Sequence, residues 1–116
     1  MPTYTKIKFS ASDSYNSPIL EESYVTENPT QIHTSSSTSG VMDEVWLWVF
    51  NSGENPYTVN ISLADGPIIV NRVEPKTTSL VLPGIPLMGG GELYFRSPDV
   101  PDDYISAMGY VNRITP

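Results

Sequence analysis

The only histidine of the chain, His33, is the first residue to consider as a catalytic group. A histidine can act as a general base, and beside a serine and an aspartate it would make a hydrolase. No serine stands in the context of a nucleophile elbow, the chain has no cysteine, and a histidine metal site would lack its usual partner ligands. We therefore expect His33 to be an exposed strand residue beside a polar loop, and the chain not to be an enzyme.

The acidic residues form two groups that could do chemistry. Asp43 and Glu44 are adjacent, so in a strand they point to opposite faces and cannot work as a paired acid and base. We expect both to be gatekeepers, charges that discourage aggregation beside an apolar strand. Asp99, Asp102 and Asp103 share one loop whose oxygens could hold Ca²⁺, but two prolines interrupt the spacing of a calcium loop. We expect a solvated loop there and no bound metal.

The run Gly89-Gly90-Gly91 would suit a phosphate-binding loop only with a Lys-Ser or Lys-Thr ending and a following helix, and it has neither. The run therefore predicts a turn in the left-handed region or a close approach of two backbones.

Aromatic residues are the remaining candidates for a binding site. Five of them could stack on sugar rings: Trp46, Trp48, Tyr94, Tyr104 and Tyr110. Aromatic side chains on strands more often pack in a core or in a subunit interface. An interface is the expectation that we carry forward, and a ligand platform is the alternative.

These candidates are positioned by a chain that is too short for more than one main domain. It has 116 residues, a formal net charge of −7 and only six Lys and Arg, which form no basic cluster. Nucleic-acid binding is therefore disfavoured, because it requires concentrated positive charge. No apolar run has the length of a membrane span, and no signal peptide is evident at the start. We expect no cofactor and no contact with nucleic acid or membrane.

The stretch from Asp43 to Phe50 is the centre of the predicted fold. Val45, Leu47 and Val49 would point to one side of a strand, and Trp46, Trp48 and Phe50 to the other. Both sides are apolar, whereas an ordinary surface strand has one wet side. We therefore expect this strand to be covered twice, once by the core of the domain and once by another part of the protein or another subunit.

Turn residues divide the rest of the chain into short strands. There are eleven prolines and eight glycines, and no helical periodicity of useful length. Six strands are predicted after residue 40 and one to three before it, with 57–63 the clearest alternation. The strands before and after Pro83-Gly84 are predicted to be separate, 78–82 and 85–88, and Gly109 is expected at a bulge or beside another backbone.

The fold class predicted from this pattern is all-β, an antiparallel β-sandwich of the jelly-roll type. Residues 1–29 would form an extended N-terminal arm that lies along neighbouring subunits, and residues 30–116 the β-sandwich domain. The apolar strand faces predict a homo-oligomer, for which we expect threefold association. The residues expected in the interface are Val45, Trp46, Leu47, Trp48, Phe50, Tyr94, Tyr104 and Tyr110.

Three motifs resemble a group of small structural proteins of tailed bacteriophages. They are Asp43-Glu-Val-Trp-Leu-Trp48, Leu82-Pro-Gly-Ile-Pro-Leu87 and Gly109-Tyr-Val-Asn-Arg-Ile114. The resemblance covers residues 30–114 and brings no catalytic residues with it. It implies a virion protein, assembled in the host cytoplasm, whose partners are the major capsid protein or other virion proteins.

The expected function is a non-enzymatic virion protein that decorates and cements the capsid. Two alternatives stay open: an adaptor of the neck or tail, and a lectin-like carbohydrate-binding module that uses the aromatic residues.

Overall fold

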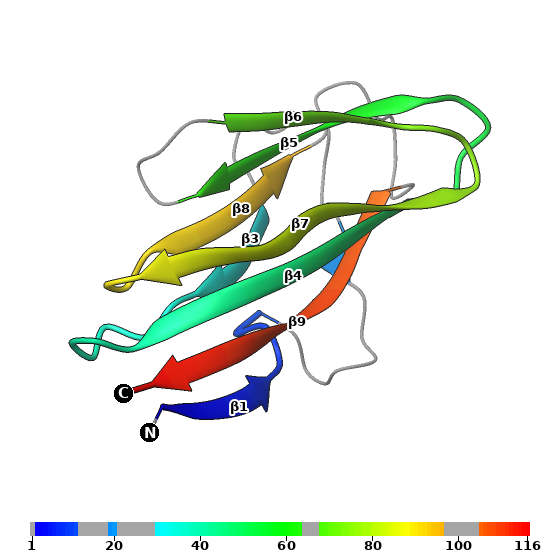
Figure 1. The fold of residues 1–116 in the computed structure, drawn as a ribbon. Helices are drawn as coiled ribbons and strands as arrows, with labels where there is room; N and C mark the ends of the chain where they lie inside the picture. The colour runs from blue at the N-terminus through cyan, green and yellow to red at the C-terminus, as the bar shows by residue number, and fades with distance from the viewer. Residues whose placement is uncertain (1, 12–18, 21–29, 64–67, 97–104) are drawn as a thin grey trace.

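The computed structural model describes residues 2–11, 19–20, 30–63, 68–96 and 105–116. In these ranges the chain forms nine strands and no helix (Figure 1). The strands are β1 (Thr3–Ile7), β2 (Ile19–Leu20), β3 (Thr30–Thr34), β4 (Met42–Asn51), β5 (Tyr57–Leu63), β6 (Ile68–Val73), β7 (Thr77–Met88), β8 (Glu92–Arg96) and β9 (Ile105–Thr115).

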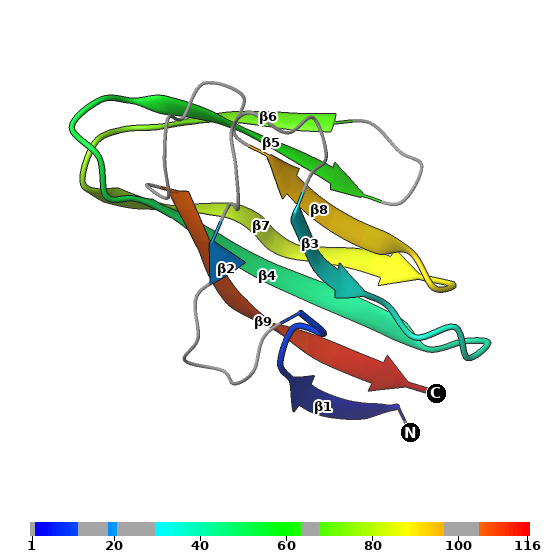
Figure 2. The same ribbon diagram turned by 180° about the vertical axis from the view of Figure 1, so that it is seen from behind.

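The strands make two antiparallel sheets. The five-stranded sheet has the order β1-β9-β4-β7, and β2 also pairs with β9 (Figure 2). The four-stranded sheet has the order β3-β8-β5-β6. The two sheets pack over one apolar core, and the predicted all-β sandwich is confirmed.

The strand pairs are nested around one hairpin. β5 pairs with β6, β4 with β7, β3 with β8, and β1 and β2 with β9. The chain therefore resembles one long hairpin that is folded over into two layers. The jelly-roll connectivity remains a prediction, which this nested order supports.

The strand bounds follow the pattern of the sequence closely. The strand predicted at 57–63 has those bounds, and six strands follow residue 40, as predicted. In β5 the expected alternation is present, with Val59 and Ile61 fully buried and Thr58, Asn60 and Ser62 half-buried on the other side. A period of two residues with one wet side is therefore a reliable signal in this part of the chain.

β7 differs from the prediction because it is one strand of twelve residues rather than two short ones. Its pairing with β4 shifts register twice, so that Gly84 and Val81 are extra residues on β7. Bulges absorb an extra residue without ending a strand, and an edge strand tolerates prolines because one side of it needs no hydrogen-bond donor. Pro83-Gly84 therefore bends this strand and does not stop it.

Gly109 stands where two neighbouring backbones come unusually close. A Cβ atom at this position would lie 1.9 Å from the carbonyl oxygen of Trp46 on β4 and 3.0 Å from Cζ of Phe9. The expected close backbone contact is thus confirmed. Gly89 and Gly90 form the predicted left-handed turn between β7 and β8, with φ of 65° and 75°.

The N-terminal segment lies against the sandwich within the described ranges. β1 pairs with β9 over five residues, and both termini lie at one corner of the molecule (Figure 1). Phe9 is 1% exposed and belongs to the core, and the backbone nitrogen of Ala11 donates to the carbonyl oxygen of Ile32 on β3. The part of the expected arm at 2–11 therefore closes one side of its own sandwich, while 12–18 and 21–29 lie outside the described residues.

Candidate functional site

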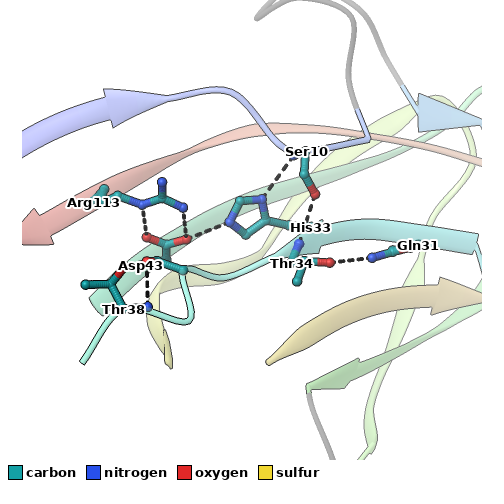
Figure 3. A network of polar contacts seen from close by, with 8 residues as sticks. Ser10, Gln31, His33, Thr34, Thr38, Asp43 and Arg113 are labelled. Atoms are coloured by element: carbon teal, nitrogen blue, oxygen red, sulfur yellow. Dashed lines mark hydrogen bonds and ion pairs between the residues drawn. The ribbon is translucent and has the colours of Figure 1, made fainter. Parts of the chain in front are cut away.

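A buried polar network joins four segments at one end of the sandwich (Figure 3). His33 on β3 lies 2.8 Å, Nε2 to Oδ2, from Asp43 on β4. Arg113 on β9 donates from Nε and Nη2 to the two oxygens of the same carboxylate, at 2.8 and 2.9 Å. The backbone nitrogen of Ser10 donates to Nδ1 of His33 at 3.1 Å. Because Nδ1 accepts, the ring proton is on Nε2, which donates to Asp43.

The position of His33 corrects the expectation of an exposed residue, because its side chain is almost completely buried. The cause is a bulge in β3, where the register with β8 shifts between Gln31 and His33. Simple alternation would put Ile32 inside and His33 outside, whereas the extra residue turns both inward. Burial lowers the pKa of His33, and the pairing with Asp43 offsets only part of this effect.

Asp43 also differs from its expected role as an exposed gatekeeper. It is 0% exposed and is fixed by Arg113 and His33. Burial acts to raise its pKa, but the hydrogen bonds from Arg113 and His33 outweigh burial and hold the pKa below its ordinary value. Glu44 points to the opposite side of β4, as expected for adjacent residues in a strand.

This network is arranged to hold strands together rather than to move protons. Both ring nitrogens of His33 are engaged, and both Asp43 oxygens accept from Arg113. A buried carboxylate with several donors stays ionised, and a histidine with no open nitrogen has no place for a substrate proton.

The outer side of the five-stranded sheet carries an apolar surface, which we call the aromatic face. Residues directly opposite one another in paired strands share a side of the sheet, so the registers define its members. They are Tyr4, Lys6, Met42, Glu44, Trp46, Trp48, Phe50, Thr78, Leu80, Pro83, Pro86, Met88, Ser106, Met108, Tyr110, Asn112 and Ile114.

Three aromatic rings form the middle of the aromatic face. The ring centroids of Trp46, Trp48 and Tyr110 are 6.1 to 6.5 Å apart, and the planes of Trp46 and Tyr110 differ by only 15°. Gly84 allows the indole of Trp46 to lie over β7, because a Cβ there would be 3.0 Å from Cζ2 of Trp46. The ammonium group of Lys6 lies 4.3 Å from the ring centroid of Tyr110.

Exposure of large apolar side chains is concentrated on this one face. In the described part of the chain, the exposed large hydrophobic residues other than Val70 all belong to the aromatic face: Tyr4, Phe50, Leu80, Met88 and Met108. Their exposed fractions run from 37% for Phe50 to 68% for Tyr4. A contiguous apolar patch of this kind on a small domain marks a site of interaction.

The outer side of the four-stranded sheet, which we call the polar face, has the opposite character. Among the residues whose side chains the structure describes, its members are Gln31, Thr34, Thr58, Asn60, Ser62, Val70, Arg72, Glu92, Tyr94 and Arg96. Val70 is its one exposed large hydrophobic residue among those described. A polar outer side of this kind is typical of an antiparallel sheet that faces water.

The structure divides the predicted interface residues into four groups. Trp46, Trp48, Phe50 and Tyr110 lie on the aromatic face. Val45 and Leu47 are 0% exposed in the core, so they are corrected from interface to core residues. Tyr94 is on the polar face, where its hydroxyl group donates to Glu92 and the pKa of Tyr94 is raised by this bond. Tyr104 lies outside the described residues.

Sequence reasoning missed several members of the aromatic face. The sequence pattern places Leu80 and Met88 in two separate strands, so it does not reveal that both lie on one side of a single strand, β7. Met108 could have been found, because the alternation of the last strand places it on the same side as Tyr110. Tyr4 was missed because residues 1–29 were treated as an arm and not as an edge of the sheet.

The remaining candidate from the sequence is the acidic loop. Asp99, Asp102 and Asp103 lie outside the described residues. Elsewhere, within the ranges that the structure describes, no three His, Cys, Asp or Glu side chains gather as metal ligands would. The same ranges contain no helix with the length and apolar character needed to span a membrane.

No known protein-family model matches this chain, and no curated protein or solved structure matches it significantly. The resemblance to phage structural proteins therefore remains a prediction.

Proposed function

We propose that this chain is a non-enzymatic structural protein that works as part of a larger assembly, and that the aromatic face is the surface that the assembly covers. The observation that supports this most strongly is the contrast between the two outer faces of one sandwich, because only one of them is apolar. The motifs that resemble phage proteins favour a virion as the assembly, with decoration and cementing of the capsid as the role.

This proposal places the main contact on the aromatic face and not on the N-terminal arm. β1 pairs with β9 of the same chain, and Phe9 fills a place in the same core. Releasing this segment to a neighbouring subunit would expose Phe9 and leave the edge of β9 that β1 covers without a partner. The aromatic face can be covered at no such cost, and many repeated weak contacts on a particle give strong attachment.

A binding experiment with capsids tests the proposal. Capsids prepared without this chain are mixed with the purified protein and sedimented, and we expect binding that saturates at a fixed number of copies per lattice position. Leu80→Glu combined with Met108→Glu should abolish binding, because both substitutions place charge on the aromatic face. Val70→Glu is the control on the polar face of the other sheet, and its added charge matches that of each single substitution, Leu80→Glu or Met108→Glu.

Two results of this experiment would change the proposal. Failure of the unaltered protein to sediment with capsids would remove the decoration role and favour the neck or tail adaptor, whose copies are confined to one ring of the particle. Equal binding by all three forms would show that the contact lies elsewhere than on the aromatic face.

A carbohydrate-binding module is the second candidate, because the half-exposed rings of Trp46, Trp48 and Tyr110 form a possible stacking platform. Sugar sites also need polar groups around the rings to bind hydroxyl groups. Here Leu80 and Met108 flank Trp48, and the polar side chains of Glu44 and Asn112 beside Trp46 are already hydrogen-bonded within the chain. Tryptophan fluorescence during titration with a broad glycan panel should therefore stay unchanged, and a saturating change with one glycan would favour the lectin.

A further inference from the structure

We infer that the aromatic face is covered by a second copy of this chain, and that two copies pack with these faces together around a twofold axis. The inference rests on the proposed function only in treating this face as an interface. It makes a sister copy the partner that covers this face and gives the contact a twofold symmetry, so that charge on the face weakens attachment to the particle through the loss of paired copies.

The size of the face fits this partner. The sheet is four strands wide over the β1-β9-β4-β7 path, and β4 has ten residues. At the usual strand spacing and rise per residue, such a face has a projected area of about 650 Å². Side chains that project from the sheet add to this area, and a stable interface needs about 800 Å² from each partner. A second copy presents a face of the same area, so the two faces can cover each other without contacts outside them.

The charges on the face also fit a second copy. The chain has a net charge of −7, so two copies repel each other over most orientations. By the strand registers, the aromatic face carries Lys6 and Glu44 as its charged side chains, and these two charges cancel. A face without net charge allows two acidic copies to meet with the least repulsion.

The two charged groups of the face have partners within their own chain, so a second copy can cover them without leaving a buried charge unpaired. Glu44 accepts from Nε1 of Trp46 at 2.9 Å and from Nδ2 of Asn112 at 3.2 Å. The Lys6 ammonium group lies over the ring of Tyr110. Burying a charge costs the most free energy when the charge has no partner. Because Glu44 and Lys6 already have partners within the chain, burying them in the interface costs less.

The shape of a sheet favours a copy of itself. Two sheets with the same twist pack face to face with their strands nearly aligned and their side chains interdigitating. Contact between identical faces is isologous and closes at two copies, whereas a threefold ring joins two different patches. The structure therefore leads us from the threefold association expected from the sequence to a twofold one.

Sedimentation equilibrium of the purified chain, without capsids, tests the inference. We expect the mass to rise from one chain to two with increasing concentration. Leu80→Glu should weaken this dimer at least tenfold, because each dimer contains the substitution twice and places it beside apolar groups. Val70→Glu, the same kind of change on the edge strand of the other sheet, should leave the dimer unchanged. Added salt should not weaken the dimer, because it screens repulsion between acidic copies.

Three outcomes would overturn the inference: a single chain at every concentration, a trimer, or a dimer that Leu80→Glu leaves intact. Because capsids are absent, these results are independent of the proposed function. A dimer that fails to bind capsids would support the inference and remove the decoration role. A monomer that binds capsids through the aromatic face would do the reverse.

Discussion

The two sheets of this sandwich have equally regular strands and very different outer faces. On β5 of the four-stranded sheet, the outward residues are Thr58, Asn60 and Ser62. On β4 of the five-stranded sheet, Trp46, Trp48 and Phe50 are in the equivalent positions. A sheet needs one apolar side to fold, and β5 shows that this protein can make the other side polar. We therefore propose that a partner, and not folding, accounts for the apolar outer side of β4.

β4 thus has two sides with separate tasks. Its inner side runs from Asp43 to Asn51, and both of these polar residues are buried and hydrogen-bonded. Its outer side carries the rings of the aromatic face. Changes on the inner side should lower stability, changes on the outer side should weaken assembly, and changes on the polar face should do neither.

The largest effect is expected from the adjacent carboxylates at the start of β4. Asp43→Ala removes the shared partner of His33 and Arg113 and should lower the free energy of unfolding by about 3–5 kcal/mol, the usual cost of breaking a buried ion pair. Glu44→Ala, one residue away on the outer side, removes acceptors only for Trp46 and Asn112 and should cost about 1 kcal/mol. Urea unfolding measures both. Equal losses of unfolding free energy in the two variants would show that the two sides of β4 do not differ in what they contribute to stability.

A somewhat smaller effect is expected where the two sides depend on each other. Gly109→Ala places a Cβ against the backbone of Trp46, which cannot move aside, and should cost about 3 kcal/mol. It should also weaken assembly, because β9 and β4 must separate beneath Tyr110 and Trp46. Gly89→Ala is the control: nothing lies within 4 Å of its Cβ, and only its left-handed φ of 65° costs energy, about 1 kcal/mol. An unchanged Gly109→Ala variant would show that β4 and β9 are not so close.

The smallest of these effects is a dependence of stability on pH. The folded chain holds the pKa of His33 below its ordinary value of 6.5, so the unfolded chain takes up this proton first as pH falls. The contribution to stability is complete above pH 6.5 and decreases as pH falls toward the lower folded pKa. Because His33 is the only histidine, urea unfolding between about pH 7.5 and about pH 5.5 should show this decrease, and His33→Gln should remove it. A stability that rises over this interval would contradict the arrangement of the buried network.

Much of the fold could be predicted because strand periodicity is a local property. The alternation of Tyr57, Val59 and Ile61 with polar neighbours is sufficient to orient β5, and its turn residues set its ends. The apolar sides of the Trp46 strand predicted a cover on both sides; the core on one side is confirmed, and the cover on the other side stays a prediction.

The errors come from irregularities that depend on the partner strand. A bulge places His33 inside, and no local pattern announces it, because the shift exists only relative to β8. Pro83-Gly84 normally ends a strand, and it continues here because β7 is an edge strand that bulges against β4. Arg113 lies 70 residues from Asp43 in the sequence, so their pairing needs the register of β4 and β9 before it can be recognised.

The candidate site was predicted in part for the same reason. Trp46, Trp48 and Tyr110 were identified by residue type, and the structure brings them together. Tyr94 has the same type but lies on the other sheet, which only the strand order reveals.

Tryptophan fluorescence tests most directly whether the aromatic face is an interface. The chain has two tryptophans, Trp46 and Trp48, and both lie half-buried on this face, so the signal reports on no other surface. On assembly, whether with a second copy or on a particle, we predict emission at shorter wavelength and weaker quenching by acrylamide, with Val70→Glu matching the unaltered protein. Complete assembly with unchanged emission and unchanged quenching would show that the aromatic face stays exposed to water, which would contradict the account.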